Sequence, residues 1–491
     1  MKKSWILIVV VLLFIVGWAG ATYVVSDRVE KQYFGLLKQY RQWGPVTLTN
    51  QSYQRGFLST RAETLVEMTV PKAGSEEGQE PTTETLQMVL EHTMHHGPLS
   101  FGGPPGHVSF SPALATVETR LVRVVTGDGD QAFENLLQEI PELKESVSFA
   151  RVGFDGATNG LLQIPPFEKR DDDGQFLWGG VTFTTEYAPR AKTLVGTFDM
   201  PRMEFRKAGG GMRWSGIHGQ FDLVEAFPML FVGTSKMVFG PMAVTQSKQP
   251  EGESTVFELQ EIELASDSRC EGTLVHINQT MKLDGASFDG KVYGPLLFDV
   301  EMKNLDGQVL SDFQQQIQSV YREADSFMPE VLVAKVLPMY GELFTKLLAG
   351  NPELNVKRLY VATPMGEAEG TFRLKLAGLQ GVDPQDPAAL MKCLQHIDSA
   401  ADAAVDESLV RGILVSSLKS SLQKAGDGTA RQPVGDKEIE GMVDQQLAGQ
   451  LEALVAQHFI VREGKKIKSS ATFNHGELVV NGQPMPVFQG M

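Results

Sequence analysis

The sequence predicts an α+β protein: an extended, twisted antiparallel β-sheet built from repeated hairpins, with helices from the carboxy-terminal third packed on it, behind one amino-terminal transmembrane helix. Three observations lead to this prediction. The chain begins with a long uncharged run, and its middle contains a repeat of strand-like segments. After Leu305 the apolar residues change from alternating to helical spacing.

The uncharged run extends from Ser4 to Val25 and follows two lysines. At about 1.5 Å per residue, a helix of this length matches a hydrocarbon core of about 30 Å. Positive residues before the run favour a cytoplasmic amino terminus, with the rest of the chain outside. We therefore expect residues 1–26 to be a transmembrane signal-anchor, and the lipid bilayer to be a partner through residues 4–25.

A cleaved signal peptide is the alternative to a retained anchor. Ala19-Gly20-Ala21 has the small-x-small form of a cleavage site after a charged start and an apolar stretch. Apolar residues continue past this site through Val24 and Val25, which favours retention.

Beyond the anchor, the spacing of apolar residues divides the chain into three segments. Residues 27–45 are expected to form an amphipathic stalk helix that ends at Gly44-Pro45. Residues 46–304 alternate in the manner of short strands and form a β-rich repeat region. Residues 305–491 mix helical and strand-like spacing and are expected to close the same domain outside the membrane.

A repeat at a constant offset of 36 residues is the strongest sign of hairpins. The matching positions are Pro165 and Pro201, Glu168 and Glu204, Arg170 and Arg206, Gly174 and Gly210, Trp178 and Trp214, and Gly180 and Gly216. Each copy has the pattern of a strand, a glycine-rich turn and a returning strand that carries the tryptophan. Trp178 and Trp214 are therefore expected at equivalent hairpin positions.

A second recurrence places Gly-Pro after a ring-bearing residue. The four copies are Trp43-Gly44-Pro45, His96-Gly97-Pro98, Phe239-Gly240-Pro241 and Tyr293-Gly294-Pro295. Proline cannot donate to a β-ladder but is tolerated where a strand begins. Each copy is therefore expected to bend the chain and start a new strand.

The composition limits the classes of partner. With a formal net charge of -16 at pH 7, the chain has no basic surface that would neutralise phosphates, so nucleic acid is not an expected partner. The two cysteines, Cys270 and Cys393, can form one disulfide if the fold brings them together. Their spacing leaves open whether they do.

No group of residues points to catalysis. Ser416 and Lys419 have Ser-x-x-Lys spacing, but the partner motif Lys-Thr-Gly is absent and such pairs are common on polar helices. His92, His95 and His96 are the obvious metal candidates, yet on a strand His95 and His96 point to opposite faces. We expect no catalytic residue, no cofactor and no metal, and we predict that the protein is not an enzyme.

Several motifs together resemble a known family. They are the lysines and single apolar span at the start, Tyr53-Gln54-Arg55-Gly56-Phe57-Leu58-Ser59, His96-Gly97-Pro98 and Gly476-Glu477-Leu478-Val479-Val480-Asn481-Gly482. Along the length of the chain they resemble the YdgA-like family of bacterial inner-membrane proteins. The resemblance implies a single-pass protein with a periplasmic domain behind a retained anchor. It carries no catalytic residues over, because that family has no established activity.

Two functions are compatible with these expectations. The first is a non-enzymatic periplasmic binding or scaffold protein that acts on protein partners in the envelope. The alternative is a lipid-binding or lipid-handling protein whose sheet and helices enclose an apolar groove near the membrane. The residues expected to line such a groove follow helical spacing: Met328, Leu332, Val336, Met339, Phe344 and Leu348.

Overall fold

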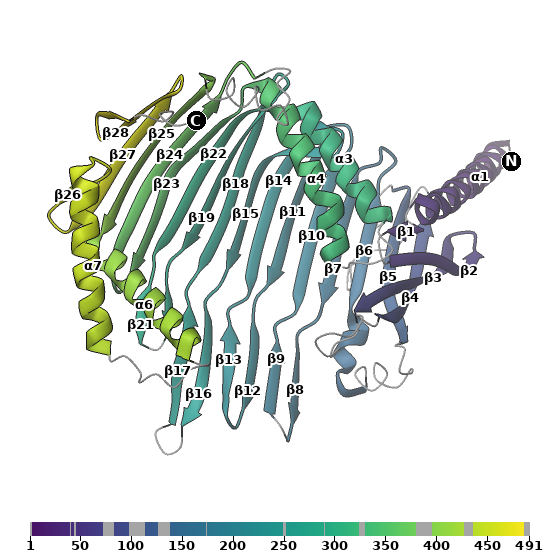
Figure 1. Cartoon of the computed structure of the whole chain (residues 1–491). Coiled ribbons are helices and arrows are strands. Elements are labelled where there is room, and N and C mark those ends of the chain that lie inside the picture. The colour runs from purple at the N-terminus through teal and green to yellow at the C-terminus, as the bar shows by residue number, and fades with distance from the viewer. Residues whose placement is uncertain are drawn as a thin grey trace. The chain divides into compact units, whose positions relative to one another are not determined.

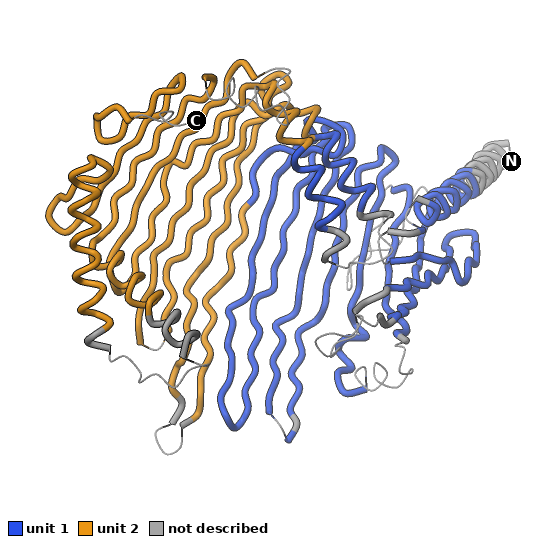
Figure 2. The backbone as a smooth tube through the Cα atoms, viewed as in Figure 1, with its two compact units in different colours: residues 1–235, 311–341 blue, residues 236–310, 342–491 orange. Residues whose placement is uncertain are grey.

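The computed structural model describes residues 2–39, 41–43, 46–71, 83–97, 113–125, 138–172, 174–248, 252–288, 290–323, 329–379, 395–426 and 436–485. It confirms an α+β fold of mostly antiparallel β-sheet, with five α-helices in the described residues (Figure 1). The chain divides into two compact units, shown in blue and orange in Figure 2. Unit 1 contains residues 1–235 and 311–341, and unit 2 contains residues 236–310 and 342–491.

Unit 1 contains one long helix and an antiparallel sheet in which each strand pairs with the next. The helix is α1 (Lys2–Gln39), and a 3-10 turn covers Pro141–Glu145. The strands, in order across the sheet, are β1 (Gln42–Trp43), β2 (Val46–Arg55), β3 (Ser59–Pro71), β4 (Thr83–His96), β5 (Ala115–Val125), β6 (Val147–Val152), β7 (Thr158–Ile164), β10 (Val181–Ala188), β11 (Thr193–Met200) and β14 (Ile217–Phe227).

Four shorter strands form a second antiparallel sheet in unit 1: β8 (Phe167–Asp171), β9 (Gly174–Trp178), β12 (Met203–Lys207) and β13 (Gly210–Trp214). Each continues a strand of the first sheet after a two-residue break, and Figure 1 shows these breaks as kinks. At two of the breaks, Gly180 and Gly216 have φ angles of 88° and 90°, a region that favours glycine. These glycines are one repeat apart in the sequence.

The hairpin prediction from the repeat is confirmed. Trp178 ends β9 and Trp214 ends β13, and both pair with Met203 of β12. Since residues that pair across antiparallel strands share a face, the two tryptophans occupy equivalent positions on one face. Strands begin after three of the four Gly-Pro copies, since β2 begins at Val46, β16 at Met242 and β22 at Leu296. The residues that follow His96-Gly97 lie outside the described part of the chain, so the fourth strand start stays a prediction.

Unit 2 repeats the same plan. Its first sheet contains, in order of pairing, β18 (Ile262–Glu271), β19 (Leu274–Leu283), β22 (Leu296–Asp306), β23 (Glu353–Thr363), β24 (Gly366–Leu376), β25 (Ile397–Asp406), β27 (Lys466–Asn474), β28 (Glu477–Val480) and β29 (Gln483–Met485), and β26 (Val461–Glu463) also pairs with β27. Its second sheet contains β16 (Met242–Lys248), β17 (Gly252–Leu259), β20 (Ala286–Phe288) and β21 (Lys291–Tyr293).

The remaining helices come in two pairs, each of which follows a strand. In unit 2, α6 (Glu407–Gly426) follows β25 directly and is followed by α7 (Asp436–Ala456), while a 3-10 turn covers Leu348–Gly350. The strand β15 (Leu230–Phe239) and the helices α3 (Gly307–Glu323) and α4 (Pro329–Leu347) contain residues of both units.

The expected transmembrane segment is helical, since α1 runs without a break from Lys2 to Gln39. Most side chains of the uncharged run, those of residues 4–17, 19 and 20, lie outside the described part of the structure. Among the residues that are described, no helix is both long enough and apolar enough to cross a membrane. The anchor therefore stays a prediction.

Candidate functional site

The strands of unit 2 have one apolar face and one polar face. In β24 the polar side chains Glu367, Glu369, Thr371, Arg373 and Lys375 are exposed, and the residues between them are half-buried or buried. Side chains alternate between the faces of a strand, and paired residues of neighbouring strands share a face. Successive pairing of the strands from β18 through β27 therefore continues the apolar face and the polar face across the sheet.

Cross-strand pairing arranges the apolar side chains in rows. The first row contains Ile262, Leu283, Leu296, Val361, Ala368, Val405 and Ile467. The second row contains Leu264, Met281, Phe298, Leu359, Gly370, Ala403 and Ser469. Because neighbouring strands lie about 4.8 Å apart, the four large side chains of the second row span roughly 14 Å.

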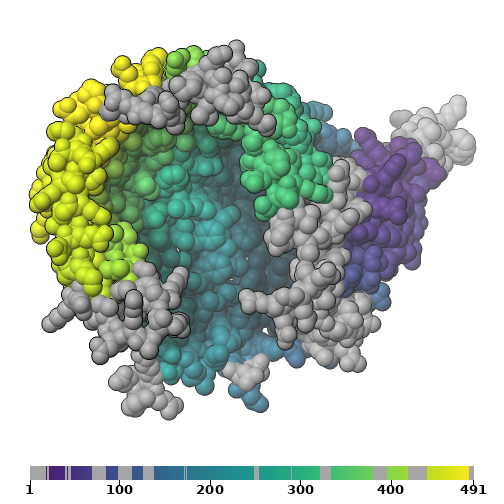
Figure 3. Space-filling view, viewed as in Figure 1, coloured from purple at the N-terminus to yellow at the C-terminus, as the bar shows by residue number. Residues whose placement is uncertain are grey.

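In the described part of unit 2, helices pack on the end of the first row. Val410 and Leu414 of α6, with Leu447 and Leu451 of α7, pack against Val405 and Ile467. In the second row, Leu264 is 38 % exposed, Met281 39 % and Leu359 46 %. Figure 3 shows this face of the unit 2 strands as an open hollow, with α7 as its yellow wall. An apolar strand face of this extent is normally covered by a second layer.

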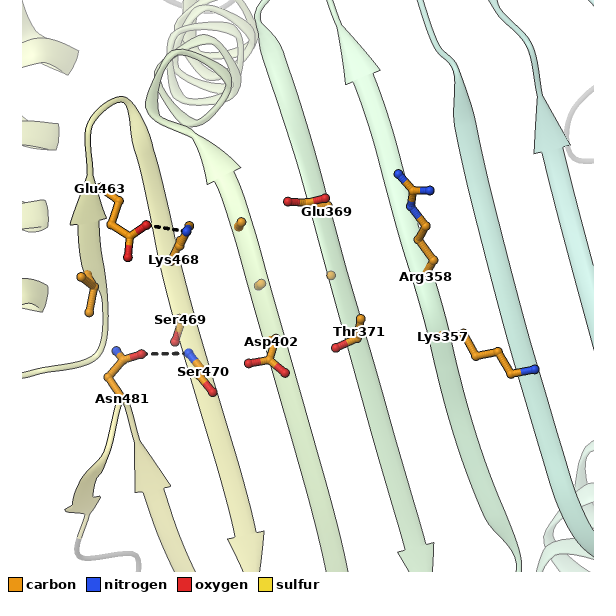
Figure 4. Close-up of a pocket in the computed structure, with 14 residues that line it drawn as sticks. Lys357, Arg358, Glu369, Thr371, Asp402, Glu463, Lys468, Ser469, Ser470 and Asn481 are labelled. Atoms are coloured by element: carbon orange, nitrogen blue, oxygen red, sulfur yellow. Dashed lines mark hydrogen bonds and ion pairs between the residues drawn. The ribbon is translucent and has the colours of Figure 1, made fainter.

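The opposite face of the same strands carries a polar pocket of about 550 Å³ (Figure 4). Its charged lining residues are Lys357, Arg358, Glu369, Asp402, Glu463 and Lys468. Lys357 Nζ lies 3.4 Å from Glu301 Oε1 and donates to Asn278 Oδ1 at 3.0 Å, and Lys468 pairs with Glu463. With three acids and three bases, several already paired, this pocket is a charge-balanced, solvated surface.

A second group of interactions seats α1 on the sheet of unit 1. Its buried residues follow helical spacing on one side of α1: Thr22, Val25, Ser26 and Val29, with the half-buried Tyr33 continuing the stripe. Val25 and Val29 form a buried cluster with Ala62, Met94, Leu114 and Ala115. The helix is therefore held by the sheet as far back as Thr22, inside the uncharged run.

Hydrogen bonds extend the contact between α1 and the sheet beyond the apolar cluster. The Tyr33 hydroxyl lies 3.0 Å from Asn50 Oδ1 and 2.9 Å from Thr64 Oγ1. The His92 ring lies between two hydroxyls, with Nε2 2.9 Å from Thr64 Oγ1 and Nδ1 2.9 Å from Thr119 Oγ1. Burial lowers the pKa of His92 below its ordinary value, so the neutral ring fits this position.

The packing of α1 against the sheet of unit 1 is expected to become less stable in acid. Burial also lowers the pKa of His96, which is 1 % exposed and bonds to Thr60. Below the ordinary histidine pKa of about 6.5, the unfolded chain binds protons that the folded seat does not, so the free energy of unfolding falls as pH drops from about 7.5 toward 5. Urea unfolding at several pH values measures this slope. His92→Gln should make the slope shallower, and an unchanged slope would contradict a role for His92.

The structure describes four of the six side chains that the sequence proposed for a lipid groove. The side chains of Met328 and Leu332 lie outside the described residues. Val336 and Met339 are half-buried in unit 1, whereas Phe344 is 57 % exposed in unit 2. Leu348 is buried in a cluster with Leu376 and Leu379. Their role as a groove lining stays a prediction.

The histidines and cysteines considered in the sequence lie in different parts of the structure. His92 and His96 pair with residues on the face of β4 that contacts α1, and His95 lies on the other face. Cys270 Sγ donates to the Gly272 carbonyl oxygen at 3.3 Å. Cys393 and the side chain of Lys419 lie outside the described residues, so the disulfide remains open.

Sequence reasoning missed the apolar rows and the seat of α1. The signal for the rows was present in the alternation of Ala368, Phe372 and Leu374 with charged residues. The signal for the packing of α1 on the sheet was the stripe from Thr22 to Tyr33. The hydrogen-bonding partners of Tyr33, however, are 17 and 31 residues away along the chain.

A family model described as bacterial protein of unknown function, DUF945, matches residues 1–488. The chain belongs to the DUF945 family. This membership confirms the resemblance at its coarser level, a bacterial family without an assigned activity. No curated protein matches this DUF945 chain.

Proposed function

We propose that this DUF945 protein is a lipid-binding protein of the bacterial envelope, and that the apolar face of the unit 2 strands holds acyl chains. The observation that supports it most is the second row, where Leu264, Met281 and Leu359 remain 38 % to 46 % exposed. Apolar surface gains free energy when it leaves water, at about 0.8 kcal/mol for each buried CH₂. An acyl chain lying along the row supplies such groups without any polar atom.

The chemistry of the sheet favours an acyl chain over an extended peptide. The backbone N–H and C=O groups of β19, β22, β23 and β24 are already used in ladders with neighbouring strands. A peptide lying on the face of the sheet would leave its own backbone groups unpaired and desolvated, at a cost of about 1–3 kcal/mol for each group. A hydrocarbon chain has no such groups.

The proposed location follows from the amino terminus. The uncharged run Ser4–Val25 and the narrower resemblance to YdgA-like inner-membrane proteins support a retained anchor in the inner membrane and a periplasmic main body. This location tethers the protein to a source of lipid. The periplasmic scaffold expected first from the sequence is the competing function, and the following experiment distinguishes the two.

The full chain, made in bacteria, is expected in the membrane fraction with Met1 as its first residue, and mass spectrometry of solvent extracts is expected to find phospholipid bound to it. Leu359→Asp should reduce the bound lipid about tenfold or more, because burial of a leucine side chain contributes about 1.5–3 kcal/mol and a carboxylate resists desolvation. The folded state should persist, since Leu359 is already 46 % exposed.

The matched control is Thr472→Asp, which places the same charge at an exposed position on the polar face of β27. It should retain wild-type lipid. If Leu359→Asp unfolds the chain, Leu264→Asp repeats the test on β18. Wild-type protein that carries no lipid, or variants of the row that keep it, would exclude the acyl-chain site and leave the scaffold function.

A further inference from the structure

The turn between β2 and β3 exposes two large apolar side chains beside α1. Phe57 is 52 % exposed and Leu58 38 %. The turn is tight at Gly56, where an added Cβ would lie 2.3 Å from the carbonyl oxygen of Ser59. The close approach of the backbone at Gly56 makes the turn short, and Phe57 and Leu58 are the two residues between Gly56 and the start of β3.

Arg55 fixes this turn to the helix. Its Nε donates to Ser26 Oγ at 2.9 Å, and its two terminal nitrogens reach Glu30 Oε2 at 3.0 Å and the Tyr23 carbonyl oxygen at 3.2 Å. Its guanidinium also lies over the Tyr23 ring, 4.7 Å from the centroid. These contacts fasten the turn to the last residues of the uncharged run and the first residues after it.

The position of the turn along α1 determines whether the turn lies at the level of the membrane. The Phe57 ring contacts the Trp18 ring edge-on, with centroids 6.0 Å apart. Trp18 precedes Val25, the last residue of the uncharged run, by seven residues, or about 10 Å along a helix. Tyr23 and Val24 of α1 are 63 % and 66 % exposed. Phe57 is thus level with residues inside the uncharged run.

We propose that the Gly56-Phe57-Leu58 turn is a membrane wedge that inserts into the bilayer leaflet around the outer end of the uncharged run of α1. The proposal rests on the anchor of the proposed function. Tyr23 and Arg55 lie near the end of the run, where amphipathic side chains favour the level of the lipid headgroups, and the apolar Phe57 ring lies deeper, beside Trp18. The sheet of unit 1 then rests directly on the membrane at β2 and β3.

Spin labels in the full chain test the wedge. Cys270 and Cys393 are replaced by serine, and single cysteines are introduced as Phe57→Cys, Val24→Cys and Phe154→Cys. Phe154 is the matched control, a phenylalanine of another unit 1 turn that is 50 % exposed. In vesicles of phosphatidylethanolamine and phosphatidylglycerol, the label at position 57 should collide several-fold more with oxygen, relative to a water-soluble nickel chelate, than the label at position 154.

The three labels separate failure of the wedge from failure of the anchor. If the label at position 24 meets lipid and the label at 57 meets water, the wedge is wrong and the anchor stands. If both labels meet water, the anchor and the wedge fail together. If the label at 57 is shielded from oxygen and nickel alike, the turn is covered by protein, and the membrane is not its partner.

Discussion

Gly216→Ala is expected to lower the free energy of unfolding by roughly 3 kcal/mol or more. Gly216 has a φ angle of 90°, which is strained for any residue with a Cβ, and an added Cβ would lie 1.8 Å from the carbonyl oxygen of Met200. This neighbour is backbone and cannot rotate away. The kink between β13 and β14 would have to open, and urea unfolding followed by tryptophan fluorescence measures the loss.

Gly464→Ala is the matched control for this substitution. Gly464 also has a positive φ, 65°, but an added Cβ there meets nothing within 4 Å. Its cost should be the backbone strain alone, about 1 kcal/mol. Equal losses for the two variants would show that the close approach at the kink contributes nothing to stability.

Val29→Asp is expected to detach α1 from the sheet of unit 1. Val29 is 5 % exposed and packs in the buried cluster with Ala62 and Met94. A carboxylate in this place has no cationic partner within the cluster, and burying it costs several kcal/mol, roughly 3–5, so the helix leaves its seat instead. Hydrogen exchange should then accelerate in the part of α1 from Thr22 to Tyr33, while the strands of unit 2 keep their protection.

Leu36→Asp provides the control on the same helix. Leu36 is 56 % exposed, so the same charge stays in water and the stability should change by no more than about 0.5 kcal/mol. If Val29→Asp exchanges no faster than Leu36→Asp, the apolar cluster does not hold α1.

The hairpins could be predicted from the sequence because their signals are local. The 36-residue repeat placed Trp178 and Trp214 at equivalent positions, and both pair with Met203. The Gly-Pro copies marked the starts of strands at Met242 and Leu296. Turn residues and alternation act within a few residues of themselves, so one sequence is enough to identify them.

The candidate sites could not be predicted because they depend on tertiary contacts: whether a second layer covers the apolar face of a strand, and which distant residues a side chain meets. Alternation along β24 predicts an apolar face, but it does not tell whether a second layer covers that face. Leu348 and Phe344 have the same helical spacing in the sequence, yet one is buried beside Leu376 and the other is 57 % exposed. Tyr33 reads as part of an apolar stripe, whereas its hydroxyl bonds to Asn50 and Thr64.

The two-residue kinks make each long hairpin a self-contained building block. Each hairpin contains its own turn and its own breaks at glycine or proline, and it contributes side chains to both faces of the sheet. The copies around Trp178 and Trp214 are examples. In a repeat array each unit contacts mainly its neighbours, so a unit can be gained or lost with little repacking elsewhere. Each block widens a sheet by about 9.6 Å, the width of two strands. A sheet of this kind therefore gains or loses width in whole hairpins.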